Sequence, residues 1–534
     1  MTSNSGFAGT GYLVRLALRR DRVRIPVWVA GIVALLYLSA ESERALFETQ
    51  DQIDAYADLV GRSPATVAIG GPDIGLHTLE GIVMYETYLT VISAISIMAV
   101  LMVSRHSRAE EESGRTELVR VTEVGRHAAA ASSLVVTGGT CALVGLGMAV
   151  VLPATPLSAA SSIVYGAAMT ALGLVMAALT LCFAQLFVHA RAVTGAGLAA
   201  FLTFYVIRAV GDVRGDWTAW LSPIGWVQAT HIPTENRWWP LLIPLAATAL
   251  LLGVAVLLAS RRDFGGGLLP ARAGAERAPR SLTGPLGLAW RMQRGPLAAW
   301  AVALAACGAL VGMLGTSMQD MIKGNPDLAA YLAVVEGGSI IDAYQATFVL
   351  VLALVIGGFA VWSAGRGVPD EGHGRLDLVL AGPLARTRSL FADLLVTLGS
   401  VVALLLLSGV SLGLTYAAVA GDLDQGVRVS FAPLVYLPPI LVLVGVVALT
   451  YGWLPHWTWV GWLFLTFEAV VGWLGGLLKP PAWVVELSLF DRAPRYPLES
   501  LTWGPLLALT AVALTLIGVG SWGFRRRDIG RTAA

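Results

Sequence analysis

Two short phrases carry the densest charge in the chain, and they share one design. The first reads Glu110-Glu111-Glu112-Ser113-Gly114-Arg115-Thr116-Glu117, and the second reads Asp370-Glu371-Gly372-His373-Gly374-Arg375-Leu376-Asp377. Each places carboxylates ahead of a Gly-Arg pair, and each lies between long apolar runs. The two glycines allow a tight turn, and the residues after each Gly-Arg pair predict a short helix. Carboxylates and arginines of this kind can form ion pairs with another protein, so the phrases are candidate contact sites for a soluble partner.

Catalytic chemistry is not indicated anywhere in the chain. There is no G-x-x-x-x-G-K-[S/T] phosphate cradle, and the only lysines are Lys323 and Lys479, so ATP binding of the P-loop kind is excluded. There is also no H-E-x-x-H metal motif. Cys141, Cys182 and Cys307 stand in apolar runs without pairing or ligand spacing, and we expect all three to be buried core residues. We therefore predict neither an enzyme nor a cofactor or metal site in this chain.

Three charged residues fall inside apolar runs, where a charge costs about 2.5 to 3.5 kcal/mol at a helix centre and usually serves a function. They are Glu86, Arg208 and Glu468. The last two lie close to matching segments, Phe201-Leu202-Thr203-Phe204 and Phe464-Leu465-Thr466-Phe467. This register suggests that Arg208 approaches Glu468 across the axis that relates two repeats. The alternative is that Arg208 is a helix-end residue that reaches the outer membrane interface.

The composition identifies the kind of element that must position these residues. The chain is 56 % hydrophobic and 13 % charged, with a mean hydropathy of +0.71. Soluble domains carry about a quarter charged residues, so this is a polytopic membrane protein. Since a spanning helix needs roughly 20 apolar residues, the apolar runs predict an all-α fold of about twelve transmembrane helices. The net charge of +1 and the scattered arginines give no sign of nucleic-acid binding.

The chain is an internal duplication. Besides the charged phrases, Arg261-Arg262-Asp263 repeats as Arg526-Arg527-Asp528, and Leu221-Ser222 repeats as Leu487-Ser488. These matches predict two six-helix repeats in parallel orientation. We expect a first transmembrane half at 1–260, a cytoplasmic linker at 261–285 and a second transmembrane half at 286–534. Parallel repeats of this size frame a central pathway.

An amphipathic helix in the membrane interface is predicted before each half. Before the first span, three arginines share one helical face and three apolar residues share another: Arg15, Arg19 and Arg22, and Leu13, Leu16 and Ala17. Before the seventh span, Arg291 and Arg294 stand beside Leu288 and Trp290.

The arginine distribution predicts the orientation, because cytoplasmic loops retain positive charge. Arginines gather at 15–24, 261–294 and 525–531, whereas 41–80 and 320–342 are acidic. We expect a multi-pass membrane protein with both termini in the cytoplasm. The two charged phrases then also face the cytoplasm.

These features resemble one family: the ABC-2 type permeases of ABC exporters, in particular the fused two-half actinobacterial permeases for polyketide antibiotics (tetronasin type) and multiple drugs. The resemblance spans essentially the whole chain. It rests on the interfacial helices, the six-span halves, the phrases 108–115 and 370–375, and Pro383-Leu384-Ala385-Arg386 after the second phrase. The first copy departs from the pattern, with Thr122-Glu123-Val124 where the second has Gly382-Pro383-Leu384, which predicts two unequal docking sites.

The resemblance implies a transporter subunit that extrudes amphipathic or hydrophobic compounds, such as antibiotics and drugs. Two copies of a separate ATPase subunit, which bind ATP and Mg²⁺, would dock on one copy of this chain. The implied coupling residues are Glu111, Glu112, Gly114, Arg115, Glu117, Glu371, Gly374, Arg375 and Asp377. The implied pathway residues, from the second and fifth spans of the halves, are Tyr85, Glu86, Tyr88, Phe204, Tyr205, Arg208, Phe467, Glu468 and Trp473.

Two other functions stay open on the sequence alone. A proton-coupled secondary drug transporter also often has twelve spans in two halves, and Glu86 and Glu468 could be its titrating groups. A membrane scaffold or sensor that transports nothing would account for the long acidic external loops.

Overall fold

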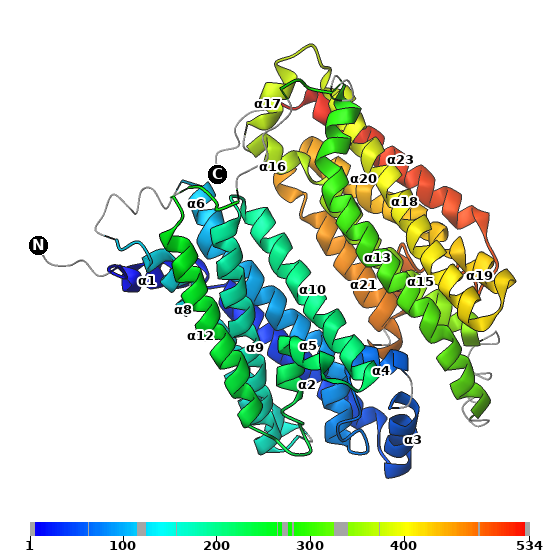
Figure 1. The fold of residues 1–534 in the computed structure, drawn as a ribbon. Coiled ribbons are helices and arrows are strands. Elements are labelled where there is room, and N and C mark those ends of the chain that lie inside the picture. The colour runs from blue at the N-terminus through cyan, green and yellow to red at the C-terminus, as the bar shows by residue number, and fades with distance from the viewer. Residues whose placement is uncertain are drawn as a thin grey trace, which may run out of the picture. The chain divides into compact units, whose positions relative to one another are not determined.

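The computed structural model of the chain is built from helices (Figure 1). It describes residues 6–61, 64–114, 124–155, 157–263, 265–269, 276–279, 282, 284–324, 340–372, 374–478 and 481–528. Strands are absent from this part of the chain, and eleven of its helices are long and apolar enough to cross a membrane. The prediction of an all-α polytopic membrane protein is confirmed. The residues divide into two compact units, Met1–Gly274 and Ala275–Ala534.

The first unit contains six long helices among its described residues. They are α2 (Arg24–Leu46), α5 (Leu79–Ser104), α8 (Ala128–Val151), α9 (Ala159–Leu186), α10 (Ala190–Arg214) and α12 (Leu242–Ser260). The shorter elements are α1 (Thr10–Arg20), α3 (Gln50–Val60), α4 (Pro64–Gly70), η1 (Arg105–Ala109), α6 (Glu110–Glu112), η2 (Leu152–Ala154), η3 (Trp217–Leu221), α11 (Pro223–Gln228) and η4 (Trp239–Leu241).

The second unit repeats this order of long helices. They are α13 (Pro285–Gly324), α15 (Ile340–Ala364), α18 (Arg386–Ala420), α20 (Leu437–Trp453), α21 (Val460–Leu478) and α23 (Trp503–Arg526). Its shorter elements are α16 (Gly367–Gly372), α17 (Arg375–Leu380), α19 (Leu423–Ser430), η6 (Ala432–Tyr436), η7 (Pro455–Trp457) and α22 (Ala482–Leu487). Helix α21 occupies the place of the remaining predicted span, and its side chains are described as far as Gly472.

Local sequence signals set the helix ends. Thr78 accepts a hydrogen bond from the backbone N–H of Gly81 at 3.1 Å and so caps α5, and Ser158 caps α9 through the N–H of Ser161 at 3.2 Å. Such caps satisfy backbone donors that the first helical turn leaves free. Helix α10 ends at Gly215, whose φ of 65° is left-handed and suits glycine.

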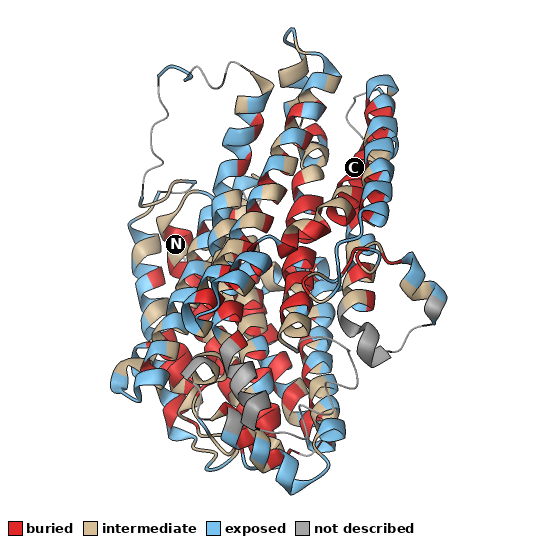
Figure 2. Cartoon of the chain, turned by 90° about the vertical axis from the view of Figure 1, so that its right-hand side faces the viewer, coloured by how far each residue is buried: buried red, intermediate tan, exposed pale blue. Residues whose placement is uncertain are grey.

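The second and fourth long helices form the core of each unit. These are α5 and α9 in the first unit, and α15 and α20 in the second, and each is buried over most of its apolar length. Helices that are apolar on all sides, as these are, belong in the interior of a bundle. The outer helices leave large apolar side chains exposed. Figure 2 shows exposed residues in pale blue and buried residues in red. In a membrane protein such surfaces suit contact with lipid.

Glycines bring two pairs of helices into close contact. A Cβ on Gly145 of α8 would lie 2.3 Å from the carbonyl oxygen of Gly166 in α9. A Cβ on Gly452 of α20 would lie 2.0 Å from the carbonyl oxygen of Gly520 in α23. Small residues at such crossings let helix backbones pack closely in a membrane.

The two predicted interfacial helices differ. In the first unit α1 is a separate helix that ends before Asp21, and the buried Asp21 carboxylate pairs with His106 at 2.7 Å and with Arg105 at 3.3 Å. In the second unit the corresponding residue is Gln293, and the helix continues without a break through Pro296 as α13. The segment predicted as an interfacial helix before the second half is thus helical and continuous with the long helix that follows it. Gln293 carries no charge and accepts a hydrogen bond from Ser363 at 2.7 Å.

The cysteine prediction also needs a correction. Cys141 and Cys182 are buried as expected, but Cys307 is exposed. It lies on an outer face of α13, a helix that buries little of its apolar length within its own unit. An apolar run in a membrane protein does not by itself place a residue in the protein core.

The glycine crossing of α20 and α23 predicts a position-specific effect on stability. Gly520→Val would force two backbones apart, and overpacking of this kind costs typically 1 to 3 kcal/mol. Gly518→Val is the matched control on the same helix, because a Cβ at Gly518 meets nothing within 4 Å. We expect Gly520→Val, and not Gly518→Val, to lower the apparent melting temperature of the detergent-purified protein. Equal melting temperatures for the two variants would contradict the crossing.

Candidate functional site

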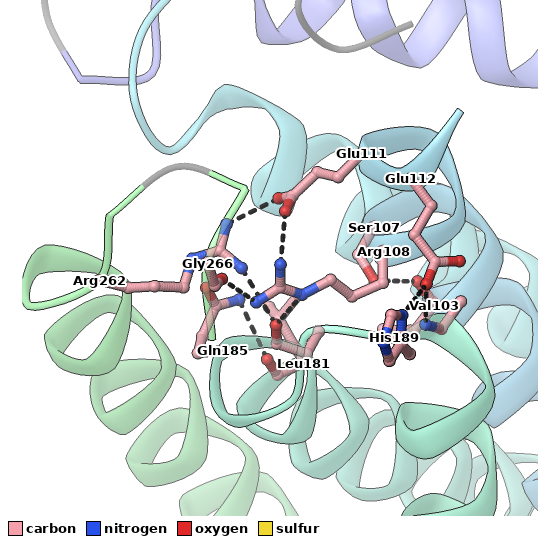
Figure 3. A network of polar contacts seen from close by, with 12 residues as sticks. Val103, Ser107, Arg108, Glu111, Glu112, Leu181, Gln185, His189, Arg262 and Gly266 are labelled. Carbon is pink, nitrogen blue, oxygen red and sulfur yellow. Dashed lines mark hydrogen bonds and ion pairs between the residues drawn. The ribbon is translucent and has the colours of Figure 1, made fainter. Parts of the chain in front are cut away.

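The first charged phrase is built on the end of the core helix α5. Past Ser104 the helix widens into the π-helical turn η1, which leads directly into α6 with its three glutamates. Such π-turns are frequent at functional sites. The turn directs Arg108 into the protein, where it is 1 % exposed. Its Nε donates to the Ala184 carbonyl at 2.6 Å and its Nη2 to the Gly266 carbonyl at 2.7 Å (Figure 3).

Glu111 lies between two arginines. One carboxylate oxygen accepts from Arg108 at 2.8 Å, and the other accepts from Arg262 at 2.7 Å (Figure 3). Arg262 follows the last long helix of the unit and also donates to the Ala184 carbonyl at 3.2 Å. The side chains of Glu111 and Arg262 are only 16 % and 10 % exposed. Charge-assisted bonds at these lengths are strong, so Glu111 joins the end of α5 to the tail of α12.

The two neighbouring glutamates join the phrase to two further helices. Glu110 accepts from Arg20 of α1 through both carboxylate oxygens at 2.8 Å. Glu112 contacts His189 Nδ1 at 3.0 Å and accepts from the backbone N–H of Ala190 at 3.1 Å. Ala190 begins α10, and a carboxylate at a helix N-terminus is favourable. Each glutamate therefore fixes the phrase to a different element of the first unit.

The second phrase is also held by a glutamate–arginine pair, but different residues surround the arginine. Glu371 corresponds to Glu111, three residues before the glycine, and forms two bonds of 2.7 Å with Arg527. The guanidinium of Arg527 lies 5.6 Å from the ring centre of Tyr451 and 5.7 Å from that of Phe524. Glu371 is 5 % exposed. Arg527 corresponds to Arg262 in the repeated Arg-Arg-Asp sequence.

We call this repeated pair the tail clasp: Glu111 with Arg262, and Glu371 with Arg527. The sequence showed both motifs in both halves, but it did not show that they meet. The sequence signal for this contact was that the charged phrase and the Arg-Arg-Asp sequence occur together in each half. The clasp also changes the roles of Glu111 and Glu371, because both acids point into their own units and neither presents a free charge to a partner.

Beyond the clasp, each phrase turns at its glycine. Gly114 and Gly374 have φ values of 71° and 68°, in the left-handed region that favours glycine. After Gly374 the predicted short helix is present as α17, with Arg375 and Asp377 exposed. Arg375 pairs with Asp370 at 3.2 Å. In the first copy, Arg115 and Glu117 lie outside the described residues.

The opposite end of the first unit holds Arg208, which is fully buried. Its Nη1 donates to Asp212 at 3.0 Å, and its Nη2 donates to the carbonyls of Ala68 and Ile69 at 3.1 and 3.0 Å. These carbonyls close the C-terminal end of α4, where a cation is favourable. The Tyr205 ring centre lies 4.7 Å from the guanidinium carbon. The alternative that Arg208 reaches outward to the membrane interface is therefore wrong.

Other predicted pathway residues gather around this arginine. Tyr85 donates to the Thr66 carbonyl at 2.5 Å, and Tyr88 donates to the Ile224 carbonyl at 3.1 Å. Both tyrosines line a cavity of about 50 Å³. Such a volume holds a few water molecules and no drug-sized compound. Glu86 is exposed and bonds to Tyr56 of α3, while Phe204 packs on the core of the unit.

Glu468 has a different set of partners in the second unit. It is buried and accepts from the Ser488 hydroxyl at 2.6 Å and from the N–H groups of Leu489 and Phe490 at 2.9 and 3.2 Å. Phe467 beside it is half-buried, and the side chain of Trp473 lies outside the described residues. Arg208 and Glu468 thus each have partners in their own unit, so neither is an isolated charge that requires the other.

Comparisons with known proteins agree with a duplicated transporter. The family model described as "Multidrug efflux system permease Rv1217c, C-terminal domain" matches residues 13–259 and 282–525, one stretch in each half. The chain is also similar to the "Multidrug efflux system permease protein Rv1217c" of Mycobacterium tuberculosis (strain ATCC 25618 / H37Rv). The two are 34 % identical over 532 residues, which cover 98 % of this chain and 96 % of that protein.

The tail clasp predicts a difference between two adjacent acids. Glu371→Gln leaves the half-enclosed Arg527 without its counter-charge, and we expect a loss of about 2 to 3 kcal/mol. Asp370→Asn breaks the exposed pair with Arg375 and should cost less than about 1 kcal/mol. Thermal unfolding of the purified variants measures both. In a double-mutant cycle with Arg527→Gln, additive losses would mean that the clasp contributes no coupling energy.

The surroundings of Arg208 predict a loss of stability at the end of the first unit opposite the charged phrase. Arg208→Ala leaves Asp212, which is 5 % exposed, without its counter-charge, at a cost of about 3 to 5 kcal/mol. Arg214→Ala on the same helix removes an exposed side chain and serves as the control. The variant should also make α4 more sensitive to protease. We expect the effects of Arg208→Ala and Glu468→Ala on stability to add, and a clear departure from additivity would support their pairing instead.

Proposed function

Because the chain belongs to the family of multidrug efflux system permeases, we propose that it is the membrane-spanning subunit of an ATP-driven ABC-2 type exporter. In this proposal it extrudes amphipathic or hydrophobic compounds, such as antibiotics, as the fused tetronasin-type permeases do. A separate subunit supplies the ATPase, since the chain has no phosphate cradle. Two copies of that subunit, with their ATP and Mg²⁺, dock on the two phrases of one chain.

The observation that carries this proposal is the anchoring of both phrases. A loop that passes movement from a soluble motor to membrane helices must be fixed to those helices. In the first unit three glutamates fix the phrase to α1, α10 and the tail of α12. In the second unit the phrase is fixed to the tail of α23. A solvated loop without function would need none of these bonds.

The anchoring also divides the predicted coupling residues by task. Glu111 and Glu371 hold the phrases in place from inside. The residues left to meet the ATPase are Gly114, Arg115 and Glu117 in the first half, and Gly374, Arg375 and Asp377 in the second. Glu112 anchors α10 but its side chain is 39 % exposed, so it could also contact the ATPase. The two docking surfaces differ in composition, so we propose that they bind with unequal strength.

The contacts of the first unit support a cytoplasmic position for the phrase. Arg20 before the first span and Arg262 after the sixth both reach it. The arginine-rich segments and the phrase therefore share one end of this unit, and positive segments face the cytoplasm. We propose that both termini lie in the cytoplasm of a bacterial cell.

The proton-coupled alternative gains no support from the proposed titrating groups. A carrier needs a carboxyl group that exchanges protons freely during transport. Glu468 instead accepts three hydrogen bonds from the segment after α22, and Glu86 bonds to a tyrosine of α3. Both acids thus have a structural task in the residues described.

The energy source can be tested with purified protein. The chain alone in proteoliposomes should hydrolyse no ATP, and its complex with a co-expressed ATPase subunit should hydrolyse ATP faster when drug is added. Charge reversal by Arg375→Glu together with Asp377→Lys should weaken this complex, without loss of folding, because both side chains are exposed. Drug uptake by the chain alone, driven by a proton gradient without ATP, would establish the secondary-transporter alternative.

The orientation can be tested with single cysteines in a Cys307→Ser background, because Cys307 is exposed. Asp51→Cys lies on the exposed face of α3 and should react with a membrane-impermeant maleimide in intact cells. Arg277→Cys in the linker should react only after the cells are opened. The reverse pattern would invert the proposed topology.

A further inference from the structure

The amphipathic helix α1 borders a large cavity. Leu13, Leu16, Ala17 and Arg20 recur at the spacing of one helical face and line a cavity of about 920 Å³. Of the α1 residues only Ala17 is buried, and Leu16 remains 39 % exposed. Apart from Ala17, the residues of α1 that line the cavity are therefore only partly covered by protein.

Small side chains on the opposite wall create the space. Ala129 and Ala130 of α8 face the cavity, together with Leu181 of α9. Leu181 is 4 % exposed and lies within the core of the unit. The walls from α1, α8 and α9 are thus mainly apolar, as in sites that bind drug-sized molecules, which measure about 300 to 1,000 Å³.

Among the described residues, the polar part of the lining holds arginines and carboxylates in equal number, beside His106 and His127. Three arginines and three carboxylates line it, Arg20, Arg126, Arg262, Glu110, Glu111 and Asp263. Arg20 pairs with Glu110 and Arg262 pairs with Glu111, while Arg126 donates to the carbonyls that end α12. Gln185 and Ser132, 6 % and 5 % exposed, add an amide and a hydroxyl. Figure 3 shows Gln185 and Leu181 beside the Glu111 cluster.

We propose that this cavity is a binding site for an amphipathic molecule without net charge, drawn from the membrane leaflet on which α1 lies. Its apolar part would lie under α1 against Ala129, Ala130 and Leu181. Its polar end, neutral or zwitterionic, would meet the ion pairs and the Gln185 amide. A cation or anion would disturb the existing pairs, and for that reason the site disfavours both. Two sources have this chemistry, a zwitterionic membrane lipid and a transported compound.

A transported compound as the ligand rests on the proposed function. In that case binding in the cavity would affect the first charged phrase. The polar end of the ligand would touch Glu110, Glu111 and Arg262, which also fix the first charged phrase to the helices. A ligand in the cavity would then contact the residues that hold the first charged phrase in place. In the described part of the second unit the interfacial segment continues into α13, so no separate helix is seen there that could cover such a site.

Photolabelling of the full chain in lipid nanodiscs tests the site without any ATPase. Two phosphatidylcholine probes are used and mapped by mass spectrometry: one carries a diazirine on its acyl chain and reports on Leu181, and the other carries a diazirine in its headgroup and reports on Gln185. Lipid around the protein labels all outer helices, so the informative positions are Leu181 and Gln185, which are buried. We expect both to be labelled in the unaltered protein, with at least a fivefold reduction in Ala130→Trp, which fills the cavity. Val135→Trp, at an exposed position of α8, should label like the unaltered protein.

Competition separates the two sources. If excess phosphatidylcholine abolishes the labelling and drugs that the cells export do not, the cavity is a lipid site. Loss of the signal with a drug that the cells export would identify a substrate site. The proposal is overturned if Leu181 and Gln185 are never labelled, or if neither Ala130→Trp nor the smaller filling variant Ser132→Leu reduces the labelling. Thermal unfolding confirms that these variants are folded. Failure of drug transport would contradict the proposed function and leave the labelling result intact.

Discussion

The position of one carboxylate controls the charged end of the first unit. Glu111 is held between Arg108 and Arg262, and the three side chains join the end of α5, the end of α9 and the tail of α12. Breaking such a pair would leave a guanidinium partly buried without its counter-charge, which is costly. The order of the neighbouring segments depends on this cluster, because Glu110 and Glu112 are placed by the same short helix. The loop beyond Gly114 therefore begins from a fixed point.

The second unit keeps the geometry of the anchor and changes its chemistry. Arg108 has no counterpart there, since the corresponding residue is Val368, and the aromatic rings of Tyr451 and Phe524 flank Arg527 instead. A similar exchange occurs at the other end. Tyr205 and Glu468 occupy the same register on the fifth long helix, and each ties that helix to a neighbouring segment, one as a hydroxyl donor and one as a carboxylate acceptor. At these places the two halves make contacts between segments at equivalent positions, although the residues that make them differ.

Hydropathy and internal repeats were sufficient to predict the helical membrane fold and the order of the long helices, because these depend on long averages of side-chain polarity. Contacts of single residues depend on tertiary geometry and were not predictable in the same way. The acids of the two phrases were predicted to face a partner, but the direction of Glu111 follows from a π-helical turn that no motif announces. The sequence also did not predict that the second interfacial segment continues into the following helix, and the difference has a local reason. Gln293 lacks the charge by which Asp21 is drawn to Arg105 and His106, so the chain continues as one helix.

That continuous helix gives the two halves different mechanics. With 40 residues at 1.5 Å per residue, α13 is a rod of about 60 Å, roughly twice the thickness of the hydrocarbon core. A displacement at the N-terminal end of α13 would be transmitted along the length of the helix. In the first half the break at Asp21 separates α1 from α2, and a joint of this kind absorbs a displacement by rotation. A displacement of the same size at the start of each half would therefore move the transmembrane segment that follows by different amounts.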